Sequence, residues 1–508
     1  MPNPDFNLFT HFEKQFAAHA NDELLCTEQD RSYDYMAIDR RAAQIACYLT
    51  DLGLSPGDRV SVQVAKSAES LCLYLACLRG GFVYHPMNMG YKSRELEYFL
   101  ADAEPSIVIC DSRNEAAIRK IVDGAGIKHL LTLNKDGKGT LWKQSNSYPE
   151  TFDTVRRAHM DLAALLYSSG TTGVPKGIML THGNLLSNTE SLVEAWGFTA
   201  TDRLLHALPI FHVHGLFVAI GCVLLSGASM RWLPAYNVKH VIRYLPECTV
   251  MMGVPTYYTR LLEEASFTAE VASNVRLFVS GSAPLLAETF VDFAGRTGQH
   301  ILERYGMTET NMNTSNPLHG ERKAGTVGPP LPGVTVRITN DKGAVVDAGE
   351  VGNLQVRGPN VFIGYWKMPD KTEQDFTDDG FFETGDKGCI DKDGYVSIVG
   401  RAKDVVITGG LNVYPKEVEL FIDDLPGVSE SAVIGIPHAD LGEAVVAVVV
   451  KESGSEIRNT EIVNACKQEL ANFKVPKNVV FIDELPRNTM SKVQKNVLRE
   501  AYDGLVNE

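Results

Sequence analysis

The sequence predicts an α/β protein of at least two domains, and three observations carry this prediction. With 508 residues, the chain is too long for a single hydrophobic core. From Tyr33 onward the spacing of apolar residues switches repeatedly between periods of about 3.6 and about 2, which is typical of alternating helices and strands. After Gly325 the pattern changes to short β-rich segments separated by Gly and Pro, which indicates a separate small β structure.

Two α/β series make up the first part of the chain. The first alternates helical periodicity with short apolar runs, at 33–54, 58–65, 70–88 and 106–111. The second covers 204–302 and contains the strand candidates "TVMMGVP" and "VRLFVSG". Short apolar runs bounded by Gly or Pro are typical of buried strands. We therefore expect two α/β subdomains here.

The β-rich segments that follow predict a small barrel or twisted sheet, at 325–340, 352–366 and 394–400. The last part of the chain returns to helices and strands with many charges, which predicts a small α+β domain; its segments are 415–425, 431–437, 444–450 and 459–470. A charged turn and a Gly pair separate these regions at 400–415. We place the domain boundary there, giving domains 1–402 and 403–508.

Composition and charge exclude several classes of function. Apolar residues make up 44% of the chain and charged residues 22%, with a formal net charge of −15, so neither a nucleic acid nor an anionic membrane is expected as a partner. The N-terminus lacks a signal-peptide core, and the longest apolar run, 216–225, is about half the roughly 20 residues of a bilayer span. Nine scattered cysteines without metal-ligand spacing predict reduced thiols, neither disulfide nor zinc, and a cytoplasmic location.

The segment "YSSGTTGVPKG", 167–177, follows an apolar strand candidate and has the composition of a phosphate-binding loop. Its glycines let the backbone approach an anion, its hydroxyls can donate to phosphate oxygens, and Lys176 adds a positive charge. The alternative is an ordinary surface loop, since Ser, Thr and Gly are common there. The P-loop pattern of nucleotide triphosphatases is absent, because Lys176 follows Pro175 and precedes Gly177.

This segment and six later ones resemble, in the same order, motifs of the adenylate-forming superfamily, which includes the acyl-CoA synthetases. The later segments are "GSAPL", "YGMTE", "TGD", "GRAKD", "GGLNVYP" and "LPRNTMSK", beginning at 281, 305, 384, 400, 409 and 485. The resemblance implies a large N-terminal domain, built of two α/β subdomains and a small β-barrel, and a mobile α+β C-terminal domain. It also implies that the protein activates a carboxylate with ATP and Mg²⁺ to an acyl adenylate and passes the acyl group to CoA.

The resemblance assigns roles residue by residue. The implied ATP-binding residues are Ser168, Ser169, Gly170, Thr171, Thr172, Gly173, Lys176, Gly281, Ser282, Ala283, Tyr305, Thr308, Asp386 and Arg401. Thr172 and Glu309 are the implied Mg²⁺ partners, and oxygen ligands of this kind suit that ion. Gly409 and Gly410 are implied in CoA binding, and Lys403 lies at the hinge about which the C-terminal domain turns.

Lys492 is the implied catalytic residue of adenylation, together with His212 and Glu309. A compact ammonium group can contact the attacking carboxylate and an α-phosphate oxygen at once and stabilise the charge that develops between them. The alternative is a surface lysine in a charged region. A lysine acyltransferase acting on Lys492 is a further expected partner.

The segment "TNMNTSNP", 310–317, is rich in amides and hydroxyls, whereas a long-chain acyl pocket needs a continuous apolar lining. It indicates a short polar acid as substrate. Together with "HALPIFHVHGLF" (206–217) and "GVPTYYTRLL" (253–262), it resembles malonyl-CoA synthetases. Arg304 is then implied to bind the distal carboxylate of malonate, unless it pairs with Glu303, and Arg260 is either a second such ligand or a helix-surface arginine.

His212 is implied to act as a gate beside the reacting carboxylate, and Val213 and Met312 are implied to shape the space around the α-carbon of the acid. Val213 stands where the resembled synthetases have Thr, so methylmalonate is a second expected substrate. The predicted reaction is malonate, CoA and ATP to malonyl-CoA, AMP and pyrophosphate. Two alternatives stay open: a CoA ligase for another short-chain acid, and a non-catalytic module that binds an acyl adenylate.

Overall fold

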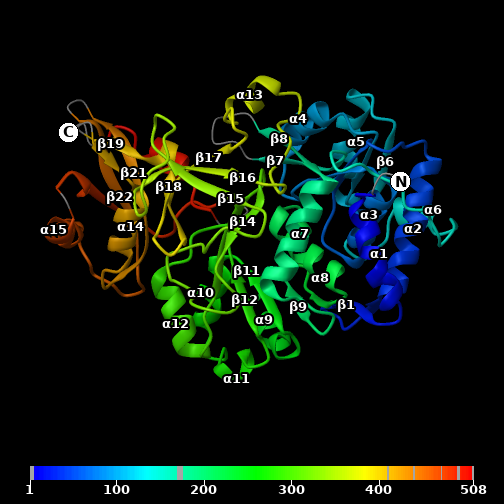
Figure 1. Ribbon diagram of the computed structural model, residues 1–508, viewed down its shortest axis with the longest axis horizontal. Coiled ribbons are helices and arrows are strands. Elements are labelled where there is room, and N and C mark those ends of the chain that lie inside the picture. The colour runs from blue at the N-terminus through cyan, green and yellow to red at the C-terminus, as the bar shows by residue number, and fades with distance from the viewer. Residues whose placement is uncertain are drawn as a thin grey trace.

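The computed structural model describes residues 5–168, 175–408, 411–438, 441–470, 472–488 and 492–505, and its N-terminal part contains two large sheets (Figure 1). The first has six strands in the order β6-β5-β3-β4-β7-β8, parallel except for β8. Its strands are β3 (Arg59–Gln63), β4 (Val83–Pro86), β5 (Ile107–Cys110), β6 (His129–Thr132), β7 (Leu162–Ser168) and β8 (Lys176–Thr181). Its helical segments are α2 (Tyr35–Asp51), α3 (Ala68–Gly80), α4 (Ser93–Ala103), η1 (Ser112–Asn114), α5 (Glu115–Gly124) and α6 (Thr140–Ser145).

The second sheet has eight strands in the order β14-β13-β12-β11-β9-β10-β1-β2, with antiparallel strands only at its two edges. Its strands are β1 (Glu23–Thr27), β2 (Ser32–Asp34), β9 (Arg203–His206), β10 (Ser229–Trp232), β11 (Val250–Gly253), β12 (Leu277–Ser280), β13 (Leu302–Met307) and β14 (Asn311–Ser315). The helical segments of this part are α1 (Leu8–Ala18), α7 (His182–Trp196), η2 (His214–Ala219), α8 (Ile220–Ser226), α9 (Val238–Tyr244), η3 (Leu245–Glu247), α10 (Pro255–Glu263), α11 (Ala269–Ala272) and α12 (Ala287–Thr297).

One hydrophobic core joins the two sheets. Helices α1, α3, α7 and α8 pack against one another, and a single cluster of buried side chains extends from β3 of the first sheet to β9 of the second. Parallel strands covered on both faces read as continuous apolar runs, which is why β5 and β11 are buried at every position. Helix α7 begins where the Thr181 side chain accepts the Asn184 amide and ends at Gly197 in the left-handed conformation (φ 58°).

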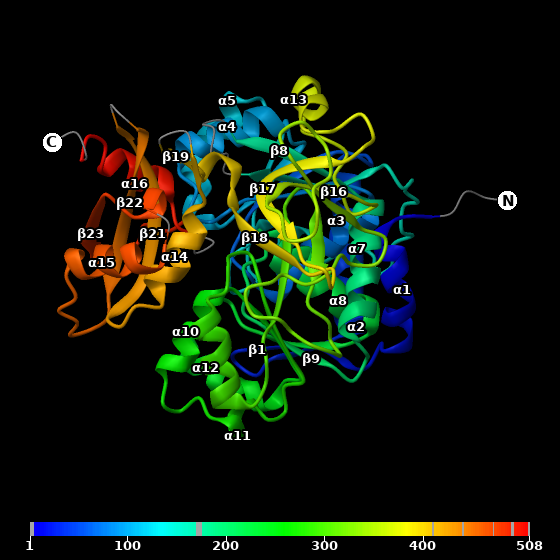
Figure 2. The ribbon, with the colours of Figure 1, turned by 60° about the vertical axis from the view of Figure 1, so that its left-hand side comes forward.

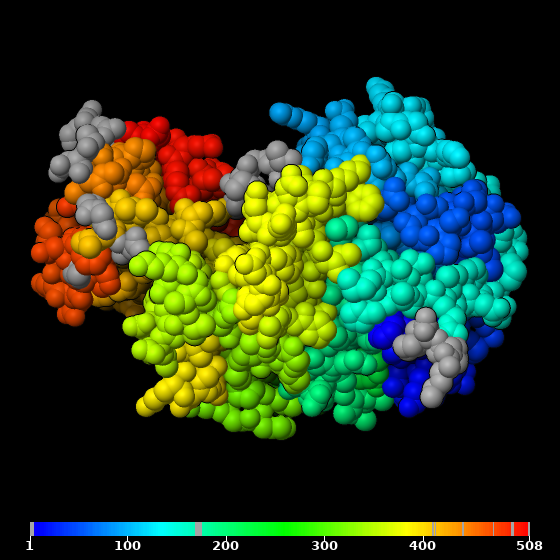
Figure 3. Space-filling view, turned by 45° about the horizontal axis from the view of Figure 1, so that its top comes forward, coloured from blue at the N-terminus to red at the C-terminus, as the bar shows by residue number. Residues whose placement is uncertain are grey.

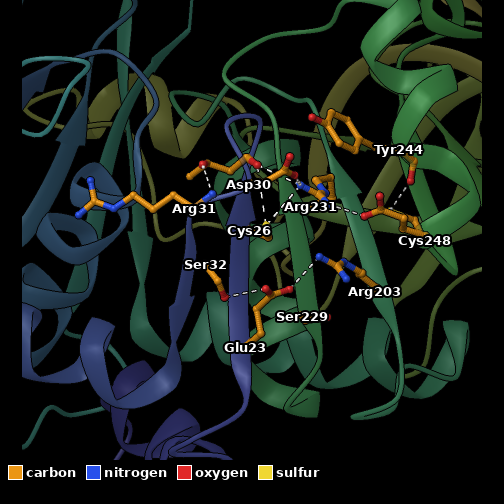
Figure 4. A network of polar contacts seen from close by, with 12 residues as sticks. Glu23, Cys26, Asp30, Arg31, Ser32, Arg203, Ser229, Arg231, Tyr244 and Cys248 are labelled. Atoms are coloured by element: carbon orange, nitrogen blue, oxygen red, sulfur yellow. Dashed lines mark hydrogen bonds and ion pairs between the residues drawn. The ribbon is translucent and has the colours of Figure 1, made fainter.

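Within this second sheet, a network of charged side chains connects β1 and the turn after it to β9 and β10 (Figure 4). Arg231 of β10 is 4% exposed and donates to Asp30 (2.8 Å), to the Thr27 carbonyl (3.0 Å) and to Glu247. Glu23 of β1 accepts from Arg203 at 2.7 Å. These contacts lie on the face of β10 opposite to Trp232, because neighbouring residues of a strand point to opposite faces.

The predicted small β structure is a four-stranded antiparallel sheet in the order β15-β16-β17-β18. It contains β15 (Thr335–Thr339), β16 (Gly352–Arg357), β17 (Phe382–Ile390) and β18 (Val396–Arg401), with α13 (Pro369–Gln374) beside it. An isolated bridge between Thr314 and Pro330 connects its approach segment to β14. The β-rich region therefore lies next to the "YGMTE" segment.

The C-terminal part is an α+β unit built on a five-stranded sheet. Its elements are η4 (Ala402–Asp404), β19 (Val406–Thr408), β20 (Leu411–Val413), α14 (Pro415–Asp423), β21 (Val428–His438), β22 (Gly442–Lys451), α15 (Asn459–Glu469), η5 (Asn472–Lys474), β23 (Asn478–Ile482) and α16 (Lys495–Ala501). Figure 2 shows this unit at one side of the large N-terminal part, and in Figure 3 it meets the yellow and green segments. The fold class predicted from the sequence is confirmed.

No helix in the described part of the chain combines the length and the apolar composition that crossing a bilayer requires.

Candidate active site

Strands β17 and β18 place Asp386 and Arg401 directly opposite each other, and β13 brings Tyr305 to the same point. The Asp386 carboxylate accepts from Arg401 Nε at 2.8 Å and from the Tyr305 hydroxyl. Because Asp386 is only 5% exposed, its ion pair with Arg401 raises the pKa of the arginine. An aromatic ring, a carboxylate and a guanidinium from three separate motifs thus form one polar cluster.

Glu309 lies beside this cluster and is buried, with 8% of its surface exposed. Burial raises the pKa of its carboxyl group, whereas the cations Arg401, Lys176 and Lys492 act in the opposite direction. The Lys176 ammonium group also lies 4.5 Å above the ring of Tyr365. Cations from β8, β18 and the C-terminal part therefore surround one buried acid, as the binding of a polyanion requires.

Lys492 lies close to this polar cluster and comes from the C-terminal part of the chain. Its backbone N–H donates to Asn488 Oδ1 at 3.0 Å, and its carbonyl accepts from the Asn488 N–H at 2.9 Å, so the segment turns back on itself. The Lys492 side chain is exposed. Desolvation by nearby protein atoms nevertheless lowers its pKa. Arg401 lowers this pKa further, whereas Asp386 raises it. Lys492 is close enough to interact electrostatically with residues of β13, β17 and β18.

Arg304, one residue before Tyr305, is buried and forms no ion pair with the residues that the structure describes. It is 3% exposed, and its Nε and Nη2 atoms have no hydrogen-bond partner among the described residues. Glu303 does not pair with it and instead accepts the Leu285 amide at 3.1 Å. Burial lowers the pKa of Arg304, because an isolated buried charge is costly. Such a guanidinium is well suited to receive an anion.

One further polar group near Arg304 lacks a partner among the described residues. His214 Nε2 is buried and neither accepts nor donates a hydrogen bond to a described residue. His214 Nδ1 is 3.3 Å from Ser282 Oγ, and Arg304 lowers the pKa of His214 further after burial has done so. Ser282 has a positive φ of 73°, an uncommon conformation for a residue with a side chain. The unsatisfied groups of Arg304 and His214 therefore lie next to a strained turn.

Gly281 is the residue that leaves room for the Arg304 guanidinium. A Cβ atom at this position would lie 2.3 Å from Arg304 Cζ. Replacing Gly281 with Ala is therefore expected to displace the guanidinium and to cost about 1–3 kcal/mol of acid binding. Steady-state kinetics should show a higher KM for the acid than in the wild type. Replacement of Gly295, where a Cβ would have open space, is the matched control.

The segment between β9 and η2 contributes His212 and Val213 to the same region. His212 is half-buried, and desolvation together with Lys492 lowers its pKa to about 3, so the imidazole is neutral near pH 7. Val213 and Met312 are 6% and 2% exposed and belong to the same buried cluster. Strand β14, which carries Met312, packs against η2.

Several polar side chains of 310–316 bond to the main chain, although Thr310 Oγ1, Asn311 Oδ1 and Asn313 Nδ2 have no partner among the described residues. Asn316 Nδ2 donates to the carbonyls of Glu303 (3.1 Å) and Thr326 (2.8 Å), and Thr314 Oγ1 donates to the Val327 carbonyl (2.8 Å). Outside this segment, Asn188 and Asn360 also donate to main-chain carbonyls, including that of Met312. These residues satisfy buried carbonyls of irregular segments beside the short strand β14. The amides and hydroxyls are therefore weaker support for a polar acid than Arg304 itself.

Burial of Glu303 predicts a pH effect on stability. Desolvation raises the pKa of this carboxyl group from 4.5 to about 7. The folded protein then holds a proton that the unfolded chain releases, so stability falls as the pH rises from about 4.5 to 7 and stays reduced above that range. Glu303→Gln removes this penalty, on the order of 3 kcal/mol.

We expect Glu303→Gln to raise Tm relative to the wild type at pH 8 but hardly at pH 5. Thermal unfolding at both values measures the difference. The exposed Glu97→Gln is the control and should shift Tm equally little at both. A Glu303→Gln shift that is the same at pH 5 and pH 8 would contradict the assignment.

Several residues singled out in the sequence do not join this cluster. Arg260 is exposed on α10 and lines a separate surface cavity of about 330 Å³ with Tyr236, Asn237, Val238, Glu263 and Glu264. Lys403 is exposed in η4, and its neighbour Asp404 pairs with Arg499 at 2.6 Å. The residues outside the described ranges are Ser169, Gly170, Thr171, Thr172, Gly173, Gly409 and Gly410; for Ser168 only the backbone is described.

Sequence reasoning missed His214 and two buried residues, Lys66 and His206. The repeated histidines of "HVH" offered a signal for His214, but a histidine among apolar residues is usually a satisfied core residue. Nothing local marks Lys66. Its position depends on contacts between distant segments.

The fold and the polar cluster of Tyr305, Asp386 and Arg401 are those expected of an adenylate-forming enzyme, and comparison with known proteins agrees. The family model described as AMP-binding enzyme matches residues 12–366, and the model of the AMP-binding enzyme C-terminal domain matches 417–492. The chain therefore belongs to the AMP-binding enzyme family.

Individual relatives resemble the chain over nearly its whole length. A malonate–CoA ligase of Arabidopsis thaliana is 33% identical, over 98% of this chain and 89% of the relative. A long-chain-fatty-acid–CoA ligase of Yersinia pestis is 35% identical, over 92% and 89%. The crystal structure of ATP-bound MatB from Rhodopseudomonas palustris superimposes with a TM-score of 0.96 at 50% identity, covering 99% of this chain and all of that one.

Proposed function

We propose that the protein is a malonate–CoA ligase, which converts malonate, CoA and ATP to malonyl-CoA, AMP and pyrophosphate. The observation that carries the proposal is Arg304, a buried guanidinium whose Nε and Nη2 atoms have no partner among the described residues. A long-chain acyl group would leave this charge unpaired, whereas the distal carboxylate of malonate would accept from it in a bidentate manner. The malonate–CoA ligase among the relatives supports the same substrate.

In the first half-reaction, a carboxylate oxygen of malonate attacks the α-phosphorus of ATP and pyrophosphate leaves. Both reactants are anions, so the protein must offset their repulsion. Lys492 and Lys176 supply positive charge from two sides, and Lys492 contacts the attacking oxygen and the α-phosphate together. Asp386 accepts the ribose hydroxyls, and Tyr305 packs against adenine.

In the second half-reaction, the CoA thiol attacks the acyl carbon of the adenylate and AMP leaves. We assign the hinge to Lys403, so that residues 403–508 turn relative to 1–402 between the two steps. The proposal includes Gly409 and Gly410 as CoA-binding residues. The neutral imidazole of His212 lies beside the acyl group without adding charge.

Mg²⁺ fits the donors present. Glu309 is a buried carboxylate that faces cations, and Mg²⁺ is usually held by one or two carboxylates together with substrate phosphates. Bound there with Thr172, the ion would neutralise phosphate charge. The proposal further includes a cytoplasmic location and a lysine acyltransferase that modifies Lys492.

The test is AMP formation from ATP, Mg²⁺ and CoA with malonate, methylmalonate, acetate and a long-chain fatty acid. Malonate is expected to give the highest kcat/KM, with methylmalonate turned over because Val213 and Met312 line the space at the α-carbon. A preference for acetate would favour the second candidate, a ligase for another short acid. Absence of AMP release with every acid would favour a non-catalytic adenylate-binding module.

A further inference from the structure

Lys66 is a buried lysine far from the polar cluster in sequence, and its ammonium group has three acceptors. It follows β3, is 7% exposed, and its hydrogen-bond partners among the described residues include no carboxylate. Nζ lies 2.7 Å from His206 Nδ1, 2.8 Å from the His206 carbonyl and 3.0 Å from the Leu208 carbonyl. It also lies 4.2 Å above the Trp232 ring, a favourable position for a cation.

His206, at the end of β9, continues this chain of hydrogen bonds. Its Nε2 atom is 2.8 Å from the Gly215 carbonyl. A carbonyl only accepts, so Nε2 must carry the proton, and in the neutral imidazole Nδ1 must then accept. Burial lowers the pKa of His206 well below its ordinary value, which keeps the ring neutral. Lys66 therefore has to donate to Nδ1, and all three of its N–H groups are used.

These contacts close the segment 206–215 at both ends. Lys66 binds the carbonyls at its start, and His206 binds the carbonyl of Gly215 in the first turn of η2. Gly215 packs so closely that a Cβ atom would lie 2.0 Å from the Pro209 carbonyl oxygen. We call this segment the acyl loop, because His212, Val213 and His214 lie within it.

Lys66 lies in the connection between β3 of the first sheet and α3, and the acyl loop follows β9 of the second sheet. Their hydrogen bonds therefore cross from one sheet to the other over 140 residues of sequence. Burial lowers the pKa of Lys66 well below its ordinary value, so a charge is costly to hold there, and an apolar residue would fill the same space at lower cost. What the charged group adds is a fixed position for three main-chain atoms of the loop.

From this geometry we infer that Lys66 and His206 are positioning residues, which hold the acyl loop so that His212, Val213 and His214 face the acid bound at Arg304. The inference rests on the proposed function for the identity of the acid. It assigns Lys66 and His206 no contact with the substrate. Their effect is on how the acid is bound and presented, whereas ATP is bound by other elements.

The test compares Lys66→Met with Arg231→Met in the whole protein. Each substitution removes a buried cation. Arg231 contacts Cys26, Thr27, Asp30 and Glu247 (Figure 4), on the face of β10 opposite to Trp232. Among the described residues, it contacts none of the acyl loop. For Lys66→Met, we expect kcat/KM for the acid to fall by about 10- to 100-fold, because a small displacement of acyl-site groups has effects of this size. The KM for ATP should stay within about twofold in both variants.

Two substitutions of His206 test its two hydrogen bonds separately, the one with Lys66 and the one with the Gly215 carbonyl. Asn can still accept from Lys66 but does not reach Gly215, and Gln can donate to Gly215 but cannot also accept from Lys66. Both are expected to raise the KM for the acid more than that for ATP, and to change the ratio of malonate to methylmalonate turnover. If Lys66→Met and both His206 variants lower activity only in proportion to the loss of Tm, as Arg231→Met does, the inference is wrong.

The acid used is whichever one the wild type turns over best in AMP formation. A failure of the malonate assignment would therefore appear in the wild type. If instead Lys66 and His206 do not position the acyl loop, the ratio of the KM for the acid to the KM for ATP would be unchanged in the variants.

Discussion

Lys492→Ala is expected to lower the rate of acyl-adenylate formation by about 10²- to 10³-fold, the usual effect of removing one group that stabilises transition-state charge. Desolvation and Arg401 lower the pKa of Lys492, as expected for an ammonium group close to the polar cluster of Tyr305, Asp386 and Arg401. The measurement is malonate-dependent exchange of pyrophosphate into ATP. The variant should still transfer the malonyl group from pre-formed malonyl adenylate to CoA, because the proposed mechanism uses Lys492 in the first step alone.

Lys467→Ala is the control for Lys492→Ala. Lys467 is exposed on α15 of the C-terminal part of the chain. Its removal changes the net charge equally and leaves the polar cluster of Tyr305, Asp386 and Arg401 untouched. Lys467→Ala should retain the wild-type rate of pyrophosphate exchange into ATP. Equal losses of both half-reactions in Lys492→Ala would indicate a structural role and overturn the catalytic one.

Arg304→Met is expected to lower kcat/KM for malonate by about 30- to 1,000-fold, or 2–4 kcal/mol, because the distal carboxylate loses its buried partner. Turnover of acetate should change little or improve, since Met fills the space without a charge. In the absence of malonate the variant should be at least as stable as the wild type, because the uncompensated guanidinium is gone. Steady-state kinetics with both acids and Tm with and without malonate measure these effects.

The matched control is Arg260→Met, which removes an exposed guanidinium from α10. It should keep the preference for malonate, and malonate should still raise its Tm. If Arg260→Met loses the preference and Arg304→Met keeps it, the distal carboxylate binds at the α10 cavity and the site proposed at Arg304 is wrong.

The family motifs were readable from the sequence because each is a short local pattern. Asp386, Arg401 and Tyr305 were assigned to one nucleotide site from three separate segments, and the structure brings these side chains into contact. Arg304 was the most informative single residue, since the sequence left open whether Glu303 neutralises it. The structure shows Glu303 turned to the Leu285 amide, which distinguishes between the two alternatives.

What the sequence determined by itself was therefore the fold class, the family and the residues available for charge and phosphate binding, because periodicity and motif order are properties of neighbouring residues. Tertiary structure decided which of these groups are satisfied. Asn316 and Thr314 looked like ligand donors but bond to main-chain carbonyls, whereas Lys66, unremarkable in sequence, secures the acyl loop from 140 residues away. A buried polar group's role depends on the partners within about 3 Å of it, and only the folded chain places those partners.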